Sequence, residues 1–324
     1  MDNSTQTRLD RARISLEGLS VGDAFGEGFF MSFEMAARLM ASEEFGKPPF
    51  DFQDEFVLDT LIRSRRLFHR RPWRWTDDTA LAVPLVAGLE CHGQVAPRSL
   101  AAAFSAHYLR DPARGYGAAM HELLPRLAGP DWDDAALYLF RGRGSFGNGA
   151  AMRVAPLGAY FADDLDACVG NAALSARLTH AHPEGIAGAI AVAVAAAVGA
   201  RWGDSGAVPS PGEYLGEVIP FIPEGEVRDR TIAAGQFTGS PIQAAAAFGS
   251  GDEVTAMDTV PFCLWCAAHY LDNYEEALWA TVSGLGDRDT TCAIVGGIVA
   301  CFTGTEGIPP EWMEAREALP ASAA

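Results

Sequence analysis

The chain has 324 residues, of which 49% are hydrophobic, so it is long enough to bury a large core. Its 42 acidic residues outnumber its 24 basic residues, which gives a formal net charge of -18. A surface this acidic repels phosphate backbones and anionic lipids. We therefore expect the chain to bind neither nucleic acid nor a membrane.

The N-terminal sequence is polar and lacks the apolar stretch of a secretory signal, so we expect a cytoplasmic protein. The longest nearly apolar run, residues 185–200, is shorter than the roughly 18–20 residues that cross a bilayer and predicts a buried helix. Cys263 and Cys266 have a spacing seen in zinc sites, but no second pair accompanies them and their surroundings are apolar. We expect the six scattered cysteines to be reduced core thiols.

Helical periodicity dominates the chain, and Pro and Gly mark the joins between segments. The alanine-rich segments that predict helices are 80–89, 100–109, 166–178, 186–201, 274–283 and 290–302. The sequence thus predicts an all-α protein with one domain over residues 1–324 and short polar tails at about 1–10 and 318–324. Residues 204–230 are rich in Pro, Gly and Glu and fit either a surface excursion or a short subdomain.

Three glycines near the N-terminus, Gly18, Gly22 and Gly26, recur at every fourth residue. On a helix they form one stripe without side chains, which predicts the close approach of another helix or of a ligand. A loop of ordinary glycines is the alternative.

The first acidic motif places Thr76, Asp77 and Asp78 directly before an apolar helical run. Thr76 is a plausible helix N-cap, and the helix dipole favours two ionised carboxylates in the first turn. A hard cation needs such ligands. Taken alone, however, the pattern is more typical of a plain acidic cap on a surface helix.

The second acidic motif, Asp287, Asp289 and Thr290, repeats this chemistry at the start of another apolar run, about 210 residues later. If the two helix starts converge, mutual repulsion raises the pKa values of the four carboxylates unless cations neutralise them. Two Mg²⁺ or Mn²⁺ ions would cancel four charges, and both prefer oxygen ligands. A dinuclear site follows from that convergence.

A glycine-rich loop over residues 142–153 lies between the two acidic motifs and could present backbone N–H groups to a phosphate or ribose. It matches neither nucleotide-binding glycine signature, so in isolation it is an ordinary tight turn. His180 and His182 are two residues apart and face different sides of a helix, which disfavours a transition-metal site with Glu184. We expect His180 to line a pocket or to be structural.

Taken together and in this order, five motifs between about residues 14 and 312 resemble the ADP-ribosylglycohydrolase family. They are the Gly22-Asp23-Ala24-Phe25-Gly26 turn, Thr76-Asp77-Asp78-Thr79, Gly147-Asn148-Gly149-Ala150-Ala151-Met152-Arg153, Thr179-His180 and Gly286-Asp287-Arg288-Asp289-Thr290. The resemblance implies a compact orthogonal bundle of helices with two bound Mg²⁺ or Mn²⁺ ions. It also implies hydrolysis of the glycosidic bond at C1″ of ADP-ribose attached to arginine, serine or a small acceptor.

The resemblance assigns roles residue by residue. It implies metal ligation by Thr76, Asp77, Asp78, Asp287, Asp289 and Thr290. It implies catalytic roles for Asp77, Asp78 and Asp289, and an ADP-ribose site that contains Gly147, Asn148, Gly149, Met152 and His180. We add Glu27 as a catalytic candidate, because it is the nearest acid to the position where the family has one. The expected partner is ADP-ribose or an ADP-ribosylated protein or small molecule, and we expect the chain to act as a monomer.

The chain departs from the family pattern at two positions. Phe30 stands where many members have a glutamate, and Glu27 is the nearest acid, with either a site role or a role as a cap. Arg288 stands where a small or hydroxylic residue is usual between the two aspartates. We expect its guanidinium to point away, toward a carboxylate or a substrate phosphate.

Two other functions fit parts of the pattern. A catalytically impaired ADP-ribose-binding protein of the same fold would explain the missing glutamate. An all-α, Mg²⁺-dependent isoprenoid-diphosphate enzyme also uses acidic motifs on facing helices. The second is disfavoured, because it needs aspartates four residues apart on one face, whereas here they are one and two residues apart.

Overall fold

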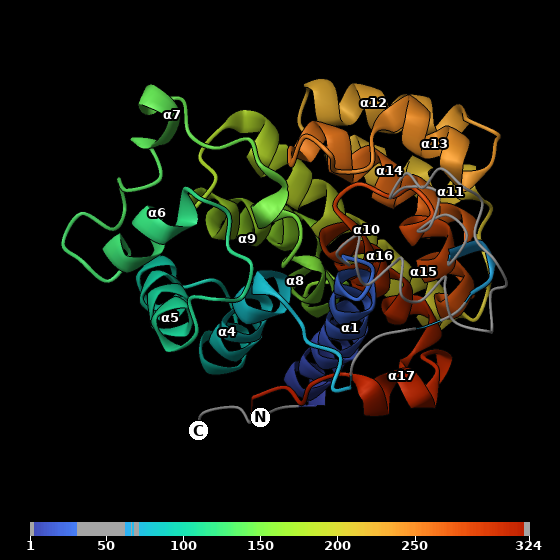
Figure 1. Ribbon diagram of the computed structural model, residues 1–324, viewed down its shortest axis with the longest axis horizontal. Coiled ribbons are helices and arrows are strands. Elements are labelled where there is room, and N and C mark those ends of the chain that lie inside the picture. Colours follow the sequence, from blue (N-terminus) through green and yellow to red (C-terminus); the bar gives the residue numbers. More distant parts are fainter. Residues whose placement is uncertain (1–2, 31–61, 66, 68–70, 321–324) are drawn as a thin grey trace, which may run out of the picture.

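The computed structural model describes residues 3–30, 62–65, 67 and 71–320 (Figure 1). Every regular element in these residues is a helix, which confirms the all-α prediction. The α-helices are α1 (Asn3–Glu27), α4 (Asp77–His92), α5 (Pro97–Arg110), α6 (Met120–Arg126), α7 (Leu139–Gly142), α8 (Ala155–Tyr160), α9 (Leu165–Arg177), α10 (Pro183–Ser205), α11 (Pro211–Val218), α12 (Glu226–Gln236), α13 (Pro241–Phe248), α14 (Ala256–His269), α15 (Tyr274–Val282), α16 (Arg288–Thr303) and α17 (Pro310–Ala315). Short 3₁₀ turns are η1 (Asn148–Ala150), η2 (Ile219–Phe221) and η3 (Thr305–Gly307).

Capping residues explain where many of these helices begin. Asp164, Thr255 and Asn273 each accept a hydrogen bond from a backbone N–H in the first turn of the helix that follows. Ser210 and Ser240 form capping boxes at α11 and α13. Each of the six predicted segments lies within one observed helix to within one residue at the ends, because alanine-rich periodicity and caps agree.

The longest buried helix, α10, lies at the centre of the bundle against α8, α9, α14 and α16. This helix is apolar on every side, and every residue from Gly188 to Ala200 is buried. By length and composition alone α10 could cross a membrane, but most of its apolar stretch is enclosed by other helices. Burial in the core therefore accounts for its composition.

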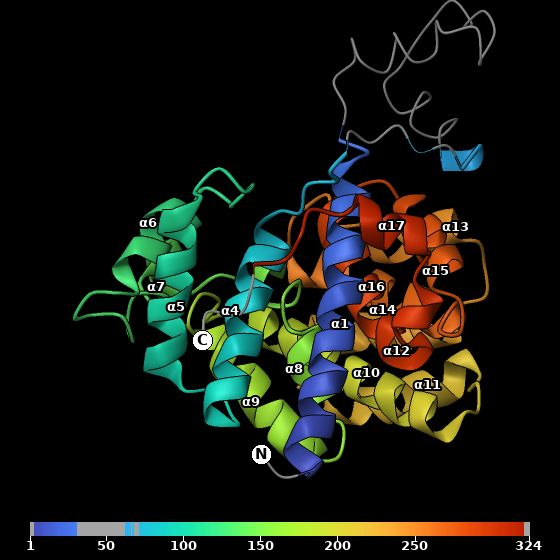
Figure 2. The ribbon, with the colours of Figure 1, turned by 90° about the horizontal axis from the view of Figure 1, so that it is seen from below.

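Helix α1 packs along α16, with α8 and α4 also in contact (Figure 2). Helices α4 to α6 lie on one side of α1, and α11 to α15 lie on the other. The predicted polar tail over residues 1–10 is wrong for residues 3–10, which belong to α1, and Leu9 is fully buried. Residues 204–230 are mostly helical and pack through α11 and α12 against α10 and α14, so they are no loose excursion.

The cysteines mostly follow expectation. Cys168, Cys263, Cys266 and Cys292 are buried, Cys301 is partly buried and Cys91 is exposed. Burial raises the pKa of Cys266 to about 12, so this thiol stays protonated at neutral pH. Cys263 and Cys266 lie inside α14 among core residues, as predicted for core packing.

The glycine stripe on α1 packs directly against the backbone of α16. A Cβ atom added at Gly18 would lie 2.3 Å from Ala300 Cβ and 2.5 Å from the Gly296 carbonyl oxygen. One added at Gly22 would lie 2.1 Å from the Cys292 carbonyl oxygen. The predicted close approach of a second helix is confirmed, and the Gly22–Gly26 segment is helical rather than a turn.

Gly18→Ala should therefore lower the free energy of unfolding by at least about 1–3 kcal/mol, because α1 must move away from α16. Gly88→Ala in α4 is the matched control, since nothing lies within 4 Å of a Cβ added there. That change should leave stability unchanged or raise it by up to about 1 kcal/mol, the difference in helix propensity. Urea unfolding followed by circular dichroism measures both, and equal effects of the two substitutions would refute the close contact.

Candidate metal centre and substrate pocket

Asp23 of α1 caps the start of α4 from outside that helix. Its two carboxylate oxygens accept hydrogen bonds from the backbone N–H of Thr76 at 2.9 and 3.0 Å, and Oδ2 accepts one from the N–H of Thr79 at 3.1 Å. The hydroxyl of Thr79 also donates to Oδ2, at 2.5 Å. Thr76 is the N-cap residue, as predicted, but its own side chain makes no capping hydrogen bond. Asp23 supplies that function and is fully buried.

Three carboxylates from three helices converge beside this cap. Ligand atoms of Asp23, Asp78 and Asp289 all lie within 4.8 Å of one another. Thr76 Oγ1 is 2.9 Å from both Asp23 Oδ1 and Asp78 Oδ2, although its single hydrogen can serve only one of them. Asp78 Oδ1 is buried and has no hydrogen-bond partner in the part of the chain that the structure describes. The convergence of α4 and α16 expected from the two motifs is thus present, and it includes Asp23 as well.

The donor set fits a hard divalent cation. All three groups are carboxylates, the ligand type preferred by Mg²⁺ and Mn²⁺. A buried, unpartnered carboxylate oxygen such as Asp78 Oδ1 is costly unless a cation or proton satisfies it. The residues present therefore suit an oxygen-coordinated metal.

The start of α16 contributes Asp287 and Asp289 to the cluster. We call the group formed by Asp23, Asp77, Asp78, Asp287 and Asp289 the acidic wall. Asp287 is the N-cap residue of α16, and its Oδ2 accepts a 2.7 Å hydrogen bond from the side-chain amide of Asn148. Asp289 Oδ1 accepts a bond from the backbone N–H of Thr290. Asn148 also donates to Thr259 at 3.1 Å, so this amide links the glycine-rich loop to the acidic motif.

The pKa values of these acids rise because burial disfavours the charged form and because the carboxylates repel one another. Burial, followed by the charge of Asp289, raises the pKa of Asp287 to about 8. Burial, followed by the charge of Asp23, raises the pKa of Asp289 to about 6. Burial and neighbouring carboxylates hold the pKa values of Asp77 and Asp78 well above their ordinary range. Without a cation, the site therefore holds protons at neutral pH.

The segment before Thr76 is clamped by the C-terminal part of the chain. The Trp73 N–H donates to the Ala315 carbonyl at 2.6 Å, and the Glu317 N–H donates to the Trp73 carbonyl at 2.8 Å. The Arg114 guanidinium stacks 3.6 Å from the Trp75 ring centroid and pairs with Glu317 at 2.7 Å. These contacts fix the strand-like approach to α4, and with it the position of Asp77 and Asp78.

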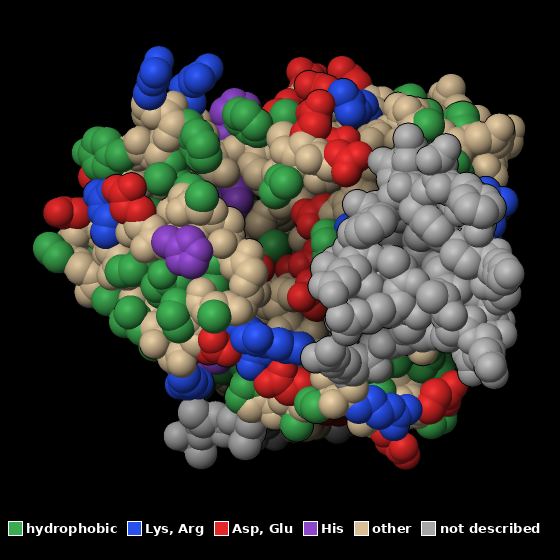
Figure 3. All heavy atoms as spheres, viewed as in Figure 1, with side chains coloured by type: hydrophobic (Ala, Val, Ile, Leu, Met, Phe, Trp, Pro, Cys, Tyr) green, Lys and Arg blue, Asp and Glu red, His purple; other side chains and the backbone are tan. Residues whose placement is uncertain are grey.

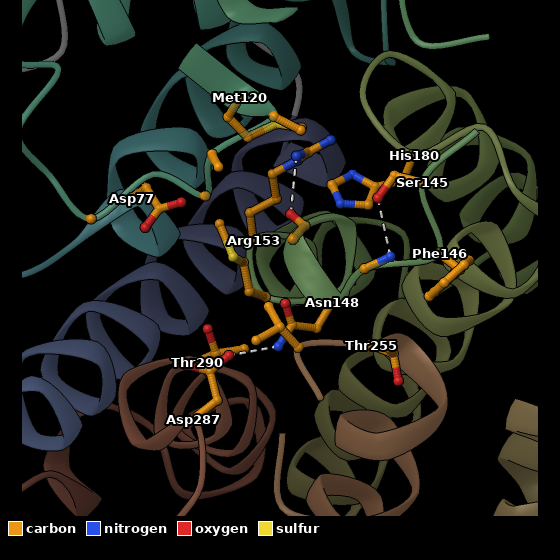
Figure 4. A pocket seen from close by; sticks show the side chains of 18 of the residues that line it. Asp77, Met120, Ser145, Phe146, Asn148, Arg153, His180, Thr255, Asp287 and Thr290 are labelled. Atoms are coloured by element: carbon orange, nitrogen blue, oxygen red, sulfur yellow. Dashed lines mark hydrogen bonds between the residues drawn. The ribbon is translucent and has the colours of Figure 1, made fainter. Parts of the chain in front are cut away.

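The acidic wall closes one end of a cavity of about 600 Å³, and acidic side chains gather in the hollow of this face (Figure 3). Of the predicted residues, those that line the cavity are Asp77, Gly147, Asn148, Gly149, Met152, His180, Asp287, Asp289 and Thr290. Thr76 and Asp78 lie behind this surface, where they are buried. Figure 4 shows Asp77 across the pocket from Phe146, with Asn148 and Arg153 between them.

The glycine-rich loop packs against His180 so closely that side chains are excluded. A Cβ added at Gly149 would lie 2.9 Å from His180 Cε1, and one at Gly147 would lie 3.3 Å from Nε2. His180 Nδ1 is 2.8 Å from the hydroxyl of Thr179, which already accepts a hydrogen bond from Arg153. The Thr179 hydroxyl can donate its hydrogen to Nδ1 while it accepts from Arg153. Burial and the charge of Arg153 lower the pKa of His180 to about 3, so the ring is neutral.

Arg153 is a fully buried cation at the cavity wall. Among the residues that the structure describes, its hydrogen-bond acceptors are neutral: the Gly149 carbonyl at 3.0 Å, the Ser175 carbonyl at 3.0 Å and the Thr179 hydroxyl at 2.8 Å. Its guanidinium also lies 4.6 Å from the Phe104 ring centroid. Burial lowers the pKa of Arg153 to about 9, and the charge of Asp77 opposes that fall. A buried cation whose hydrogen-bond partners are neutral favours an anion in the adjoining cavity.

Two aromatic side chains line the cavity away from the acidic wall. Phe140 and Phe146 are both largely exposed, and their rings are nearly parallel, with centroids 6.4 Å apart and planes at 26°. Phe140 and Val254, which also line the cavity, have left-handed backbone with φ of 51° and 54°. Such strain in residues with side chains is typical of ligand-binding positions.

The two positions that depart from the family pattern contact each other. Phe30 follows α1, and the Arg288 guanidinium lies 4.1 Å from its ring centroid. Glu27, the last residue of α1, is half-buried; burial raises its pKa, and the charges of Arg74 and Arg288 oppose that rise. Glu27 belongs neither to the carboxylate trio nor to the cavity lining, but its charge raises the pKa of Asp289. Its site role stays a prediction.

Comparison with known proteins agrees with this geometry. The profile of the ADP-ribosylglycohydrolase family matches residues 4–322. The chain belongs to the ADP-ribosylglycohydrolase family. It is 28% identical to the ADP-ribosylhydrolase ARH3 of Gallus gallus over 284 residues, which cover 77% of this chain and 76% of that one. The human ADP-ribosylhydrolase ARH3 is also 28% identical, over 279 residues, with 75% and 74% covered.

A solved structure, described as an ADP-ribosylglycohydrolase-related protein complex, shares the fold. The TM-score is 0.66 at 23% sequence identity, and the match covers 96% of this chain and 94% of that one. Together with the family match, it supports the predicted helical bundle. The chain is accordingly a hydrolase of the ADP-ribosylglycohydrolase family.

Sequence reasoning missed several residues of the site. Asp23 belongs to the Gly22–Gly26 motif, but the sequence analysis gave it no role. Its place between two glycines of the predicted helix contact could have indicated a buried functional acid. Phe140, Arg153 and the loop around Gly115 also line the cavity and were not assigned. A Cβ added at Gly115 would lie 3.3 Å from Asp77 Oδ1, so this loop approaches the acidic wall closely.

Asp23→Asn should weaken Mn²⁺ binding by about 10-fold or more and lower the melting temperature. An asparagine has one acceptor oxygen where the aspartate uses two, and changes around metal ligands typically cost 10–100-fold in affinity. Calorimetric titration with Mn²⁺ measures the effect. Asp164→Asn at the α9 cap is the matched control and should leave affinity unaltered, since asparagine caps well. Equal Mn²⁺ affinity in both variants would exclude Asp23 from the site.

The stability of the chelated protein should fall as pH rises from about 4 to about 8. Asp287 and Asp289 bind protons more tightly in the folded protein than in the unfolded protein. The stability that this protonation contributes is present at low pH, and it is lost as pH rises past about 6 for Asp289 and about 8 for Asp287. Mg²⁺ or Mn²⁺ should restore stability, most at about pH 8, because cations compete with protons. Thermal unfolding in chelator and in metal tests this, and Asp287→Asn should flatten the upper part of the chelated profile. A chelated profile that rises across this range would contradict the site assignment.

Proposed function

We propose that the protein hydrolyses the glycosidic bond at C1″ of ADP-ribose attached to a protein side chain or a small acceptor, and that it uses two Mg²⁺ or Mn²⁺ ions. The observation that carries the proposal is the convergence of Asp23, Asp78 and Asp289 at one end of a cavity that suits a nucleotide-sized ligand. Its volume of about 600 Å³ is in the range of small-molecule sites.

The cavity walls offer a partner for each part of ADP-ribose. Phe140 and Phe146 offer flat, exposed faces for the adenine, and base stacking on such rings is worth about 1–3 kcal/mol. The glycine-rich loop stands beside the buried Arg153 charge, which favours the diphosphate. The acidic wall then meets the terminal ribose at the far end of the pocket.

The metals would be held by the ligands predicted from the sequence together with Asp23. These are Thr76, Asp77, Asp78, Asp287, Asp289 and Thr290. When bound, two such cations supply positive charge for the ribose hydroxyls and for the bond that breaks. The chain's own contribution is to orient these ligands: Asp23 fixes the start of α4, and Asn148 holds Asp287.

A catalytically impaired ADP-ribose-binding protein remains the second candidate, since Phe30 occupies the position at which an acid is expected. An isoprenoid-diphosphate enzyme is not supported, because the family match assigns the chain elsewhere.

Release of free ADP-ribose from an ADP-ribosylated serine or arginine peptide should require Mg²⁺ or Mn²⁺. It should fall by about 100-fold or more in Asp289→Asn, because this change removes a carboxylate of the trio itself. Asp272→Asn, at an exposed position after α14, is the matched control. Chromatographic detection of ADP-ribose measures release, and calorimetry measures ADP-ribose binding.

Undiminished release in chelator or in Asp289→Asn would refute the metal assignment. Binding of ADP-ribose without release from either peptide would favour the binding protein over the hydrolase.

A further inference from the structure

A short loop over residues 115–119 forms the side of the pocket next to Asp77. Its residues that line the cavity are Gly115, Gly117, Ala118 and Ala119. A Cβ atom added at Gly115 would lie 3.3 Å from Asp77 Oδ1, so the loop touches the acidic wall. Because these residues have small side chains or none, the path of the loop backbone sets the shape of this side of the pocket.

The two ends of the loop are held in different ways. At the far end, the Met120 N–H donates to the Gly117 carbonyl at 2.8 Å, and the Tyr116 ring packs edge-on against Tyr108. At the near end, Gly115 has left-handed backbone with φ of 95°, and glycine keeps more conformational freedom than other residues. The near end therefore depends on Arg114, the residue before it.

Arg114 forms a two-pronged ion pair with Glu317 of the C-terminal segment. Its Nη1 and Nη2 each donate to one carboxylate oxygen of Glu317, both at 2.7 Å. Nη1 also donates to the Trp75 carbonyl at 2.9 Å, and Nε lies 2.9 Å from Asp111 Oδ2. The Arg114 side chain is only 11% exposed. Bidentate pairs of this kind are strong and directional, so the guanidinium keeps one position at the start of the loop.

The start of α4 has anchors besides this ion pair. Asp23 accepts hydrogen bonds from two backbone N–H groups there, and backbone hydrogen bonds join Trp73 to residues 315 and 317. Loss of the Glu317 carboxylate would leave these bonds in place. It would therefore release the loop and not the aspartates at the start of α4.

We propose that Arg114 and Glu317 are positioning residues, whose ion pair holds the loop over residues 115–119 against the acidic wall and so shapes the pocket for ADP-ribose. This inference rests on the proposed function and deepens it by naming the pair that shapes the substrate site. Neither side chain lines the cavity, so both act through the loop. A shift of about 1 Å in groups that position a substrate can cost about 100-fold in rate.

Glu317→Ala is the main test, since this side chain is partly exposed and its loss leaves the core intact. Calorimetry should show ADP-ribose binding about 10-fold more weakly, and KM for an ADP-ribosylated peptide should rise by a similar factor. By contrast, kcat and Mn²⁺ affinity should each fall by less than about 3-fold, because the start of α4 keeps its own anchors. A purely structural defect would lower the active fraction, and with it kcat, while KM stayed constant.

Glu276→Ala is the matched control. Glu276 forms the same kind of two-pronged pair with Arg65, at 2.5 and 2.6 Å, and does not line the cavity. Its loss should leave ADP-ribose affinity unaltered. Glu317→Gln is the conservative variant: it keeps one acceptor oxygen, so it should bind ADP-ribose more tightly than Glu317→Ala does.

A double-mutant cycle tests whether the two residues act as one. The combined change Arg114→Ala and Glu317→Ala should weaken ADP-ribose binding no more than Arg114→Ala alone, because either substitution breaks the same link. Losses that add would show that the two side chains act separately, which contradicts the inference.

The outcomes separate this inference from the function on which it rests. Unchanged ADP-ribose affinity in Glu317→Ala overturns the inference, and so does an equal loss in Glu276→Ala. An equal loss of Mn²⁺ affinity also overturns it, since the pair would then act through the metal ligands. If wild type binds ADP-ribose but releases none from either peptide, the proposed hydrolysis fails, and the calorimetric comparison still decides the inference. Wild type that does not bind ADP-ribose overturns both.

Discussion

Backbone contact between α1 and α16 sets the distance between the two halves of the carboxylate cluster. Cβ atoms added at Gly22 and Gly26 would lie 2.1 Å from carbonyl oxygens of α16, so only glycine allows this approach. Asp23 comes between these glycines and thereby reaches both Asp289 and the start of α4. A wider gap between the helices would separate the acids, and neither acidic motif alone would then make a site.

Convergence of like charges is costly, and the fold compensates for it only in part. Asp23 is well satisfied, because it accepts hydrogen bonds from the N–H and hydroxyl groups of Thr76 and Thr79. Asp78 is less well satisfied, since its Oδ1 has no hydrogen-bond partner among the described residues. Asp23, fixed by its hydrogen bonds, and Asp78, with an oxygen left for a ligand, lie in one cluster. A metal site needs both kinds of carboxylate, because some groups hold the geometry and others coordinate the ion.

The sequence predicted what depends on local order and missed what depends on distant segments. Helices followed from alanine-rich periodicity, and the two acidic motifs were recognisable because both open apolar helices. Asp23 was not assigned, because its role appears only when α1 meets α4. Phe140 was missed for the same reason: its ring faces the site only through a short left-handed stretch that no periodicity announces. The polar N-terminus was misread as a tail because its buried face is narrow.

Charge balance links the metal site to its two unusual residues. The acidic wall contains five aspartates, at positions 23, 77, 78, 287 and 289, and two divalent cations would offset four of their charges. One negative charge of the five then remains, and Glu27 adds another nearby, since its charge raises the pKa of Asp289. Arg288 supplies one positive charge between Asp287 and Asp289, and the Phe30 ring, 4.1 Å from its guanidinium, holds that charge in place. The pair thus partly offsets the repulsion among the aspartates.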